Sequence, residues 1–355
     1  MRELENGTPG RQRDRKERNR RIAAAVVAVA IVSLAAPACS SRTAERPAAR
    51  QEPDDIFAEN ASGVGEGWIG YRDGTDIVAV DPADPTTTIS LVTAEARALI
   101  DWSRDGTRLL LQGQVQEDGY MMDALYIMNA DGSETRLTGQ GLYILGGSFS
   151  PDGSMVAYGS DDGISVIEAE GGGTPRLVAA SDPSTMTWLH SPEWSPDASR
   201  IAFVTYGELR QDYAISVVNA DGTGRRDLID AQGHSVAGLA WSPDGSQLFF
   251  SHLRGIYAVG GDGWGLRIVT KSRSSPPLPP NGSREAFDIS ALALSPDGSR
   301  IAFVEHAQFG PPPYDHYPLS VVNADGTGRR QLIDLGARNP WGLAWLPEGA
   351  PIASP

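Results

Sequence analysis

Five histidines and a series of Asp-Gly steps are the first residues of this 355-residue chain to test for chemistry. His190 and His234 take corresponding places in successive repeats, so a metal held by both, with Glu193 or Asp101 as a carboxylate partner, is one hypothesis. The histidines show no HxxxH or HExxH spacing, and scattered histidines are usually solvated or hydrogen-bonded. We therefore predict no metal site and no cofactor.

The Asp-Gly steps raise the question of calcium. Asp131, Asp221 and Asp325 recur in the string Asn-Ala-Asp-Gly, but none is followed by the further oxygen ligands and final Glu of an EF-type loop. Asp-Gly is the ordinary sequence of a tight hairpin turn, and turns explain these residues. The sequence also lacks a G-x-S-x-G nucleophile elbow, so we assign no catalytic residue and favour a binding protein over an enzyme.

Aromatic and imidazole side chains supply the remaining candidates. They offer large contact area at low entropic cost, and aromatic rings stack on sugars. For each residue the alternative is a ring that only packs a loop. The candidate ligand-binding residues are Trp188, His190, Tyr213, His234, Phe309, Tyr314, His316, Tyr317 and Trp341.

A repeated turn defines the elements that must position these side chains. It recurs six times at spacings of 45 to 53 residues, beginning at Trp102, Phe149, Trp194, Trp241, Leu294 and Trp345 with strings such as Trp-Ser-Pro-Asp-Gly. A second string, SVVNADGTGRR, stands at residues 216–226 and again at 320–330. Short β-rich runs between such turns predict an all-β chain of four-stranded antiparallel units, which is the pattern of a propeller.

The ends of the repeat region predict how the ring closes. The segment from Gly67 has only the later strands of a unit, and the segment from Trp341 has only its first half. Joined, they complete a sixth blade, and closure leaves no open edge to the ring. We predict a six-bladed β-propeller over residues 66–355, closed by N- and C-terminal half-blades.

These repeats resemble those of the TolB-type propellers, a WD-like family whose blades carry a W-S-P-D-G turn. The resemblance covers residues of about 66 to 354 and implies the fold rather than a function. It does not extend to the N-terminal α/β domain of TolB, so it does not imply a part in the Tol-Pal system.

Loop lengths then indicate which face binds. The Ser-Pro-Asp-Gly and Asn-Ala-Asp-Gly turns share one rim and are short. The segments predicted to form long loops on the other rim are 112–123, 205–213, 271–288 and 306–317. Long loops gathered on one face of a rigid scaffold are where binding usually occurs.

The N-terminus predicts export. Residues 1–22 hold eight Lys or Arg against four Asp or Glu, and an uncharged run from Ile22 to Ser41 follows. This segment, residues 1–39, resembles a bacterial lipoprotein signal in which Cys39, the only cysteine, is acylated. Cleavage after Ala36-Pro37-Ala38 and an uncleaved membrane anchor are the alternatives. Residues 40–65 are polar and predicted to be a flexible linker.

Charge and localisation complete the prediction. The formal net charge is -15, and with its N-terminal end basic the rest of the chain is strongly acidic, which argues against nucleic-acid binding. We expect a membrane-tethered, extracytoplasmic propeller that binds an envelope protein or a glycan without catalysis. A hydrolase or lyase with a site in the central channel, a structural assembly scaffold, and a secreted rather than tethered protein are the alternatives.

Overall fold

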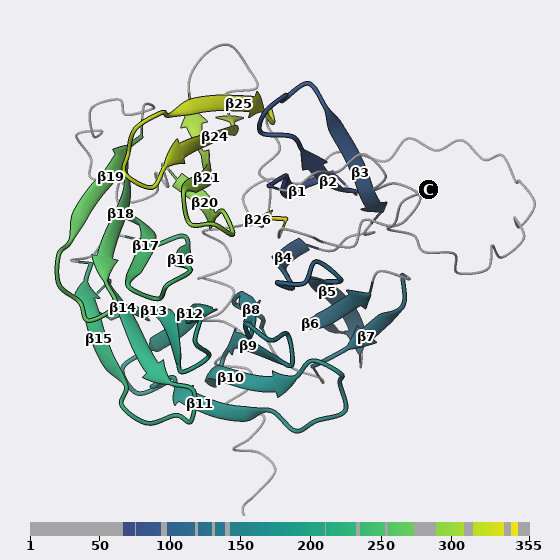
Figure 1. The fold of residues 1–355 in the computed structure, drawn as a ribbon. Helices are drawn as coiled ribbons and strands as arrows, with labels where there is room; N and C mark the ends of the chain where they lie inside the picture. Colours follow the sequence, from purple (N-terminus) through teal and green to yellow (C-terminus); the bar gives the residue numbers. More distant parts are fainter. Residues whose placement is uncertain are drawn as a thin grey trace, which may run out of the picture. The chain divides into compact units, whose positions relative to one another are not determined.

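The computed structural model describes the repeat region, which forms a ring of six four-stranded sheets (Figure 1). The described residues are 67–74, 76–93, 98–117, 120–129, 132–138, 143–209, 211–231, 235–252, 255–272, 289–308, 315–336 and 342–346. Within them every regular element is a strand. The predicted signal, Cys39 and linker lie outside the described residues.

The six sheets, named blades A to F, each run from an inner strand to an outer one. Blade A consists of β26 (Leu343–Trp345), β1 (Ile69–Asp73), β2 (Asp76–Val80) and β3 (Thr88–Thr93). Blade B consists of β4 (Ala98–Trp102), β5 (Arg108–Glu117), β6 (Tyr120–Asn129) and β7 (Glu134–Arg136). Blade C consists of β8 (Gly147–Phe149), β9 (Met155–Ser160), β10 (Gly163–Glu168) and β11 (Arg176–Ala180).

The second half of the ring repeats this order. Blade D consists of β12 (Thr187–Trp194), β13 (Arg200–Gly207), β14 (Asp212–Asn219) and β15 (Arg226–Asp230). Blade E consists of β16 (Leu239–Trp241), β17 (Gln247–His252), β18 (Gly255–Gly260) and β19 (Arg267–Lys271). Blade F consists of β20 (Ile289–Leu294), β21 (Arg300–Glu305), β24 (Pro318–Asn323) and β25 (Arg330–Asp334), beside the short pair β22 (Ala307–Gln308) and β23 (Asp315–His316).

Ring closure occurs in blade A, as the half-blade pattern predicts. The last strand, β26, pairs antiparallel with the first, β1, so that Trp345 lies opposite Ile69 and Leu343 opposite Tyr71. The inner strands of all six blades contact one another around the axis, including β26 with β4. The prediction of an all-β, six-bladed propeller closed by two half-blades is confirmed.

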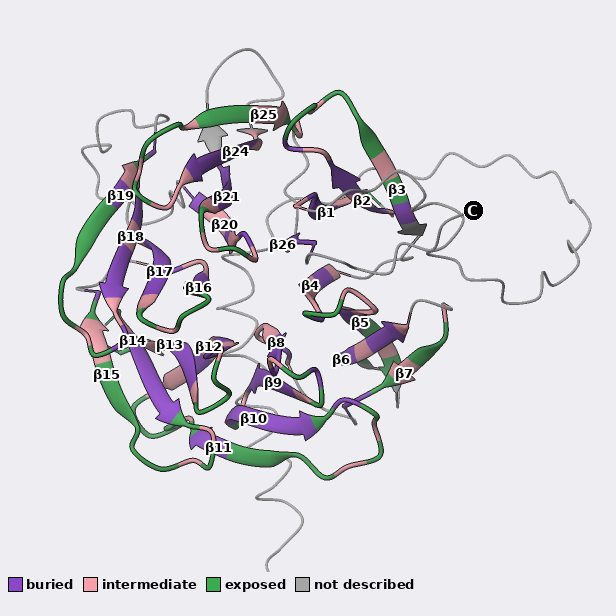
Figure 2. Cartoon of the chain, viewed as in Figure 1, coloured by how far each residue is buried: buried purple, intermediate pink, exposed green. Residues whose placement is uncertain are grey.

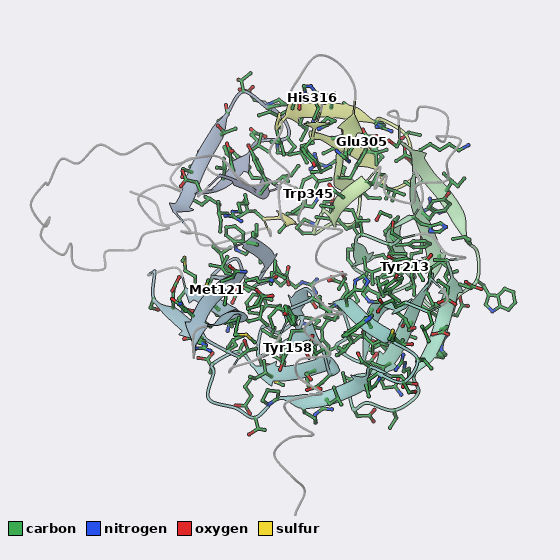
Figure 3. All side chains as sticks on the ribbon, turned by 180° about the vertical axis from the view of Figure 1, so that it is seen from behind. Met121, Tyr158, Tyr213, Glu305, His316 and Trp345 are labelled. Carbon is green, nitrogen blue, oxygen red and sulfur yellow. The ribbon has the colours of Figure 1, made fainter. Side chains whose placement is uncertain are left out.

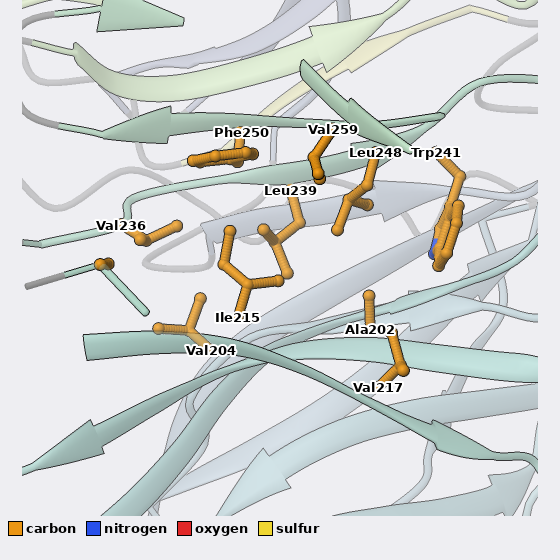
Figure 4. Packing of buried hydrophobic residues seen from close by; sticks show 11 residues of the cluster. Ala202, Val204, Ile215, Val217, Val236, Leu239, Trp241, Leu248, Phe250 and Val259 are labelled. Atoms are coloured by element: carbon orange, nitrogen blue, oxygen red, sulfur yellow. The ribbon is translucent and has the colours of Figure 1, made fainter. Parts of the chain in front are cut away.

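The core is divided among the seams between blades. Six buried apolar clusters lie one between each pair of neighbouring sheets. At the D/E seam, Val204 and Ile215 of blade D face Leu248 and Phe250 of blade E (Figure 4). Figure 2 shows the consequence, with buried middle strands, inner strands that are buried or half-buried, and largely exposed outer strands. A blade cannot bury both of its faces alone, so the ring is the unit that folds.

The Ser-Pro-Asp-Gly turn is held by its own side chains. In blade F, Ser295 Oγ donates to Asp297 Oδ1 at 2.6 Å and accepts from the backbone N–H of Arg300 at 2.9 Å. Ser299 N–H donates to the same carboxylate at 2.9 Å. These hydrogen bonds lower the pKa of Asp297 to about 2. The same bonds recur in the turns of blades B, C, D and E.

The tryptophans at the heads of the turns in blades E and A fill seams between blades. Trp241 and Trp345 are buried, and an arginine of the preceding blade lies over each ring. Arg200 is 4.9 Å from the centroid of Trp241, and Arg300 is 5.0 Å from that of Trp345. These contacts combine apolar burial with a cation–π attraction across the seam.

Two segments expected to be loops on the opposite rim are instead mostly hairpin. In blade B, β5 and β6 pair from Arg108↔Asn129 to Glu117↔Tyr120, so residues 112–117 and 120–123 are strand, with Met121 exposed near the end (Figure 3). In blade D, β13 and β14 pair as far as Gly207↔Asp212. The expectation of loops was wrong there because continued cross-strand pairing satisfies the backbone hydrogen bonds.

Candidate functional site

Blade D carries three aromatic side chains side by side at its long-hairpin end. Trp188 of β12 pairs with Tyr206 of β13, and Tyr206 pairs with Tyr213 of β14. Directly paired residues point to the same face of a sheet, so the three rings form one row across three strands. The ring centroids of Tyr206 and Tyr213 lie 4.6 Å apart at 30°. We call Trp188, Tyr206 and Tyr213 the aromatic row.

Hydrogen bonding and burial act on the polar atoms of Trp188 and Tyr213 in the row. Trp188 Nε1–H donates to Glu208 Oε2 at 3.3 Å, which orients the indole. Burial, with a smaller contribution from Tyr206, raises the pKa of Tyr213 to about 12. All three side chains are half-buried, so each keeps exposed ring surface while being held by its neighbours. A fixed, uncharged aromatic surface suits stacking rather than proton transfer.

The row continues the D/E core toward the rim, and blade E adds rings on the other side of that seam. Tyr213 and Tyr257 both pack against the D/E cluster. Tyr257 stacks on Phe250 at 5.7 Å and meets the ring of His252 edge-on at 5.5 Å. Aromatic residues therefore border the long-hairpin end of this seam from both blades.

The candidates near residue 316 lie elsewhere, on blade F (Figure 3). His316 Nδ1 is 3.2 Å from Asp334 Oδ2. Tyr317 packs against the F/A core cluster and stacks on His306 at 4.9 Å and 9°. The structure thus brings Trp188 and Tyr213 together but places His316 and Tyr317 on a different seam. Tyr317 is therefore already packed against the core, which is the alternative stated for each aromatic candidate.

The inner strands bring two carboxylates into electrostatic contact near the axis. Asp101 of β4 accepts hydrogen bonds from the backbone N–H of Trp102 at 2.7 Å and, across the B/C seam, of Phe149 at 2.8 Å. Burial raises the pKa of Asp101 to about 6 against the effect of these bonds. Burial and the charge of Asp101 raise the pKa of Glu193 on β12 as well. The negative charge of each carboxylate therefore opposes ionisation of the other.

His190 does not join this pair in a metal site. Its Nδ1 lies 3.1 Å from Ser191 Oγ, and burial lowers the pKa of the imidazole to about 4, so it is neutral at physiological pH. Across the described ranges, no three His, Cys, Asp or Glu side chains are grouped to hold a metal ion. His234, the other histidine of that hypothesis, lies outside these ranges.

The carboxylate pair predicts a pH effect on stability. The folded-state pKa of Asp101 exceeds its unfolded value, so the pair opposes folding above about pH 6, and this penalty disappears as the pH falls through 6 toward 4. Glu193→Gln removes one of the charges. We expect it to raise the free energy of unfolding at pH 8 by about 1 kcal/mol and to leave it nearly unchanged at pH 4.5.

Urea titrations at the two pH values measure this, with Glu170→Gln as the control because the side chain of Glu170 is 90% exposed. A Glu193→Gln protein that is less stable than the wild type at pH 8 would show that the carboxylate serves a structural role.

Five of the residues predicted from the sequence lie outside the described residues. They are Cys39, His234, Phe309, Tyr314 and Trp341. Tyr206 and Glu208 both fall within the segment 205–213, which the sequence predicted to be a loop, and Glu208 was not among the candidate residues. The available signal was the spacing of Tyr206 and Tyr213 about a short turn, which pairs them only if β13 continues to Gly207 and β14 begins at Asp212.

Comparison with known proteins supports the fold. No protein-family model and no curated protein matches the sequence. Among solved structures, a candidate TolB protein of Agrobacterium tumefaciens shares 22% identity over 77% of this chain and 90% of its own, with a TM-score of 0.55. The fold is a TolB-like propeller. The resemblance of the repeats to TolB-type blades is therefore confirmed at the level of structure.

Two further structures show how widely this fold is shared. A chain of a nidogen/laminin complex matches with a TM-score of 0.58 at 12% identity, over 79% of this chain and 98% of its own. The GH74 enzyme of Niastella koreensis matches with a TM-score of 0.50 at 12% identity, over 77% of this chain and 46% of its own. Likenesses at such identities report architecture and leave the function to be argued from the site.

Proposed function

We propose that this chain is an exported, membrane-tethered and non-catalytic binding protein of the cell envelope, which holds a protein segment or a glycan against the aromatic row. The observation that carries the proposal is the alignment of Trp188, Tyr206 and Tyr213 on three paired strands. Such a row offers a preorganised surface at little further entropic cost. The basic, then uncharged, N-terminal sequence supports export and tethering.

One observation favours a second candidate, a hydrolase or lyase with its site near the axis. Asp101 and Glu193 are a carboxylate pair with raised pKa values, which is a pattern found at acid–base sites. The geometry of Asp101 favours a structural role, however, because both of its oxygens accept backbone N–H bonds, one of them from blade C. A carboxylate held in this way joins blades and is not free to transfer a proton.

The binding proposal is tested by ligand screening and substitution in the row. The full chain is screened by thermal shift against cell-wall fragments, glycans and divalent metals, with a parallel pull-down from envelope extracts. For the ligand or partner so found, we expect Trp188→Ala and Tyr206→Ala each to weaken binding by about tenfold or more, because both remove a stacking surface. Tyr206→Phe keeps the ring and should bind within about twofold of the wild type.

Trp264→Thr serves as the matched control, since it removes an exposed Trp from the outside of the ring. Unchanged affinity in both alanine variants would exclude the row as the site. Loss of a hydrolytic or lyase activity in Glu193→Gln, with the row variants active, would move the function to the axis.

A further inference from the structure

The outer edge of blade E departs from the pattern of its neighbours. Blades D, E and F have a turn of the same length before the outer strand, which allows a position-by-position comparison. Three polar positions of blades D and F are apolar in blade E. They are Trp264, Leu266 and Ile268, in place of Thr223, Arg225 and Asp227 in blade D and of Thr327, Arg329 and Gln331 in blade F.

These apolar side chains are exposed. Trp264 is 79% exposed, Leu266 is 53% exposed and Ile268 is 49% exposed. Leu266, just before β19, and Ile268, within it, are two residues apart and share a face. Trp264 lies in the turn just before them, beyond Gly265 with a φ of +75°, and we call these three exposed residues the apolar stripe. Outer strands normally carry charged side chains that prevent unwanted association, and blade D has the exposed Asp227 at the position of Ile268. An exposed Trp at the head of an apolar stripe therefore marks an interaction surface.

The charge around the stripe identifies the kind of partner. From Asp262 to Lys271, blade E has one acid and two bases, a local charge of +1, whereas residues 221–230 of blade D have three acids and two bases, or -1. Arg267 and the backbone of the turn are fixed, since Arg267 donates to Ala324 O at 3.2 Å and Asp262 accepts the N–H of Trp264 at 3.0 Å. On a chain with net charge -15, this is a basic and apolar edge.

We propose that residues 264–271, the apolar edge of blade E, are where the propeller lies against an anionic lipid bilayer. Trp favours the interface between lipid headgroups and acyl chains, and Lys and Arg beside it are attracted to anionic lipids. A second copy of the chain fits less well, because pairing two such edges would bring Arg267 and Lys271 of both copies together.

A tether would make so small a contact effective. The uncharged run of the N-terminal sequence, if membrane-bound, keeps the propeller at a high effective concentration near the surface, so a weak contact can orient it. The edge comprises β19 and the end of the turn before it in blade E, whereas the aromatic row lies on β12, β13 and β14 of blade D. Membrane contact and ligand binding therefore use different residues and fail independently.

The test is fluorescence quenching of the full chain on vesicles of phosphatidylethanolamine and phosphatidylglycerol with bromine near the acyl-chain head. All eight tryptophans lie at residue 68 or beyond, so the N-terminal segment contributes no signal. We expect bromine-dependent quenching in the wild type and its loss in Trp264→Thr. The double variant Trp264→Thr/Thr327→Trp again has eight tryptophans, with the new one on blade F instead of blade E. It should not restore quenching.

The charge contribution is tested by Lys271→Gln and by the lipid. We expect Lys271→Gln to weaken the quenching response about fivefold, and vesicles of phosphatidylcholine alone to give little quenching. Trp188→Ala should be quenched like the wild type whatever its effect on ligand binding. Equal quenching in the wild type and Trp264→Thr would overturn the proposal. So would sedimentation showing a dimer that Trp264→Thr dissolves, since the edge would then be covered by a second copy.

Discussion

Replacing Glu305 by alanine is expected to lower the free energy of unfolding by about 3–5 kcal/mol. Glu305, at the end of β21, is 3% exposed and forms an ion pair with Arg329 (Figure 3). Its other oxygen accepts a hydrogen bond from Ser272 Oγ of the E/F seam at 2.8 Å. Arg329 also donates to the carbonyl of Lys271 and lies 5.0 Å from the centroid of Phe303. Removal of the carboxylate leaves a guanidinium buried without its counter-ion.

Denaturant titration of Glu305→Ala measures this loss, with two comparisons built into the chain. Glu170→Ala breaks the pair that the exposed Glu170 forms with Arg108, N to O 3.6 Å, and should change the free energy of unfolding by less than about 0.5 kcal/mol. Glu305→Thr introduces the residue that blade D has at the same place, Thr205. There Arg225, the counterpart of Arg329, donates a hydrogen bond to the carbonyl of Ala180 at 2.9 Å. We expect Glu305→Thr to lower the free energy of unfolding by less than Glu305→Ala does. Equal losses in Glu305→Ala and Glu170→Ala would contradict a buried ion pair at this seam.

Gly326→Ala is expected to be about as damaging, at about 3 kcal/mol or more. Gly326 has a φ of +91°, and an added Cβ would overlap the carbonyl oxygen of Val269 on the neighbouring blade. Gly222 occupies the same place in blade D with a φ of +93°, but there the added Cβ would lie 3.4 Å from the oxygen of Val178. Backbone strain is therefore common to both positions, and the steric overlap is specific to Gly326.

The pair of variants separates these two effects by urea unfolding. Gly222→Ala should lower the free energy of unfolding by about 1–2 kcal/mol because of its left-handed φ alone. Gly326→Ala should lower it by clearly more. Similar losses would mean that the turn of blade F moves away from β19 at little cost. A closely fitted E/F seam would then be excluded.

The fold was predictable because its determinants are local and repeated. The Ser-Pro-Asp-Gly turn is closed by its own Ser and Asp side chains, so its sequence alone specifies the hairpin. Closure by half-blades followed from counting these turns. The length of the hairpins at the other rim was missed, although Asp118-Gly119 between two polar–apolar runs was a signal for continued pairing of β5 and β6.

The candidate site was predictable only as a set of residue types. Trp188, Tyr206 and Tyr213 form a row through the register of β12, β13 and β14, which depends on strands continuing beyond the repeated core. The contact between Glu305 and Arg329 depends on a difference from the repeat, since Thr205 stands where the carboxylate would be in blade D. Asp101 and Glu193 come from different blades, so their electrostatic interaction could not be read from the sequence.

The central claim, that a ligand binds on the aromatic row, is tested most directly by the indole ¹⁵N–H signal of Trp188 in the full chain. Trp188→Phe assigns this signal among those of the eight tryptophans. During titration with the fragment or partner found by screening, we predict that the Trp188 signal shifts in a saturable way, because its N–H is already held by Glu208 beside the bound surface. The signals of Trp241 and Trp264 should stay in place. Saturable binding with an unmoved Trp188 signal, or with shifts confined to Trp102 near the axis, would contradict the account.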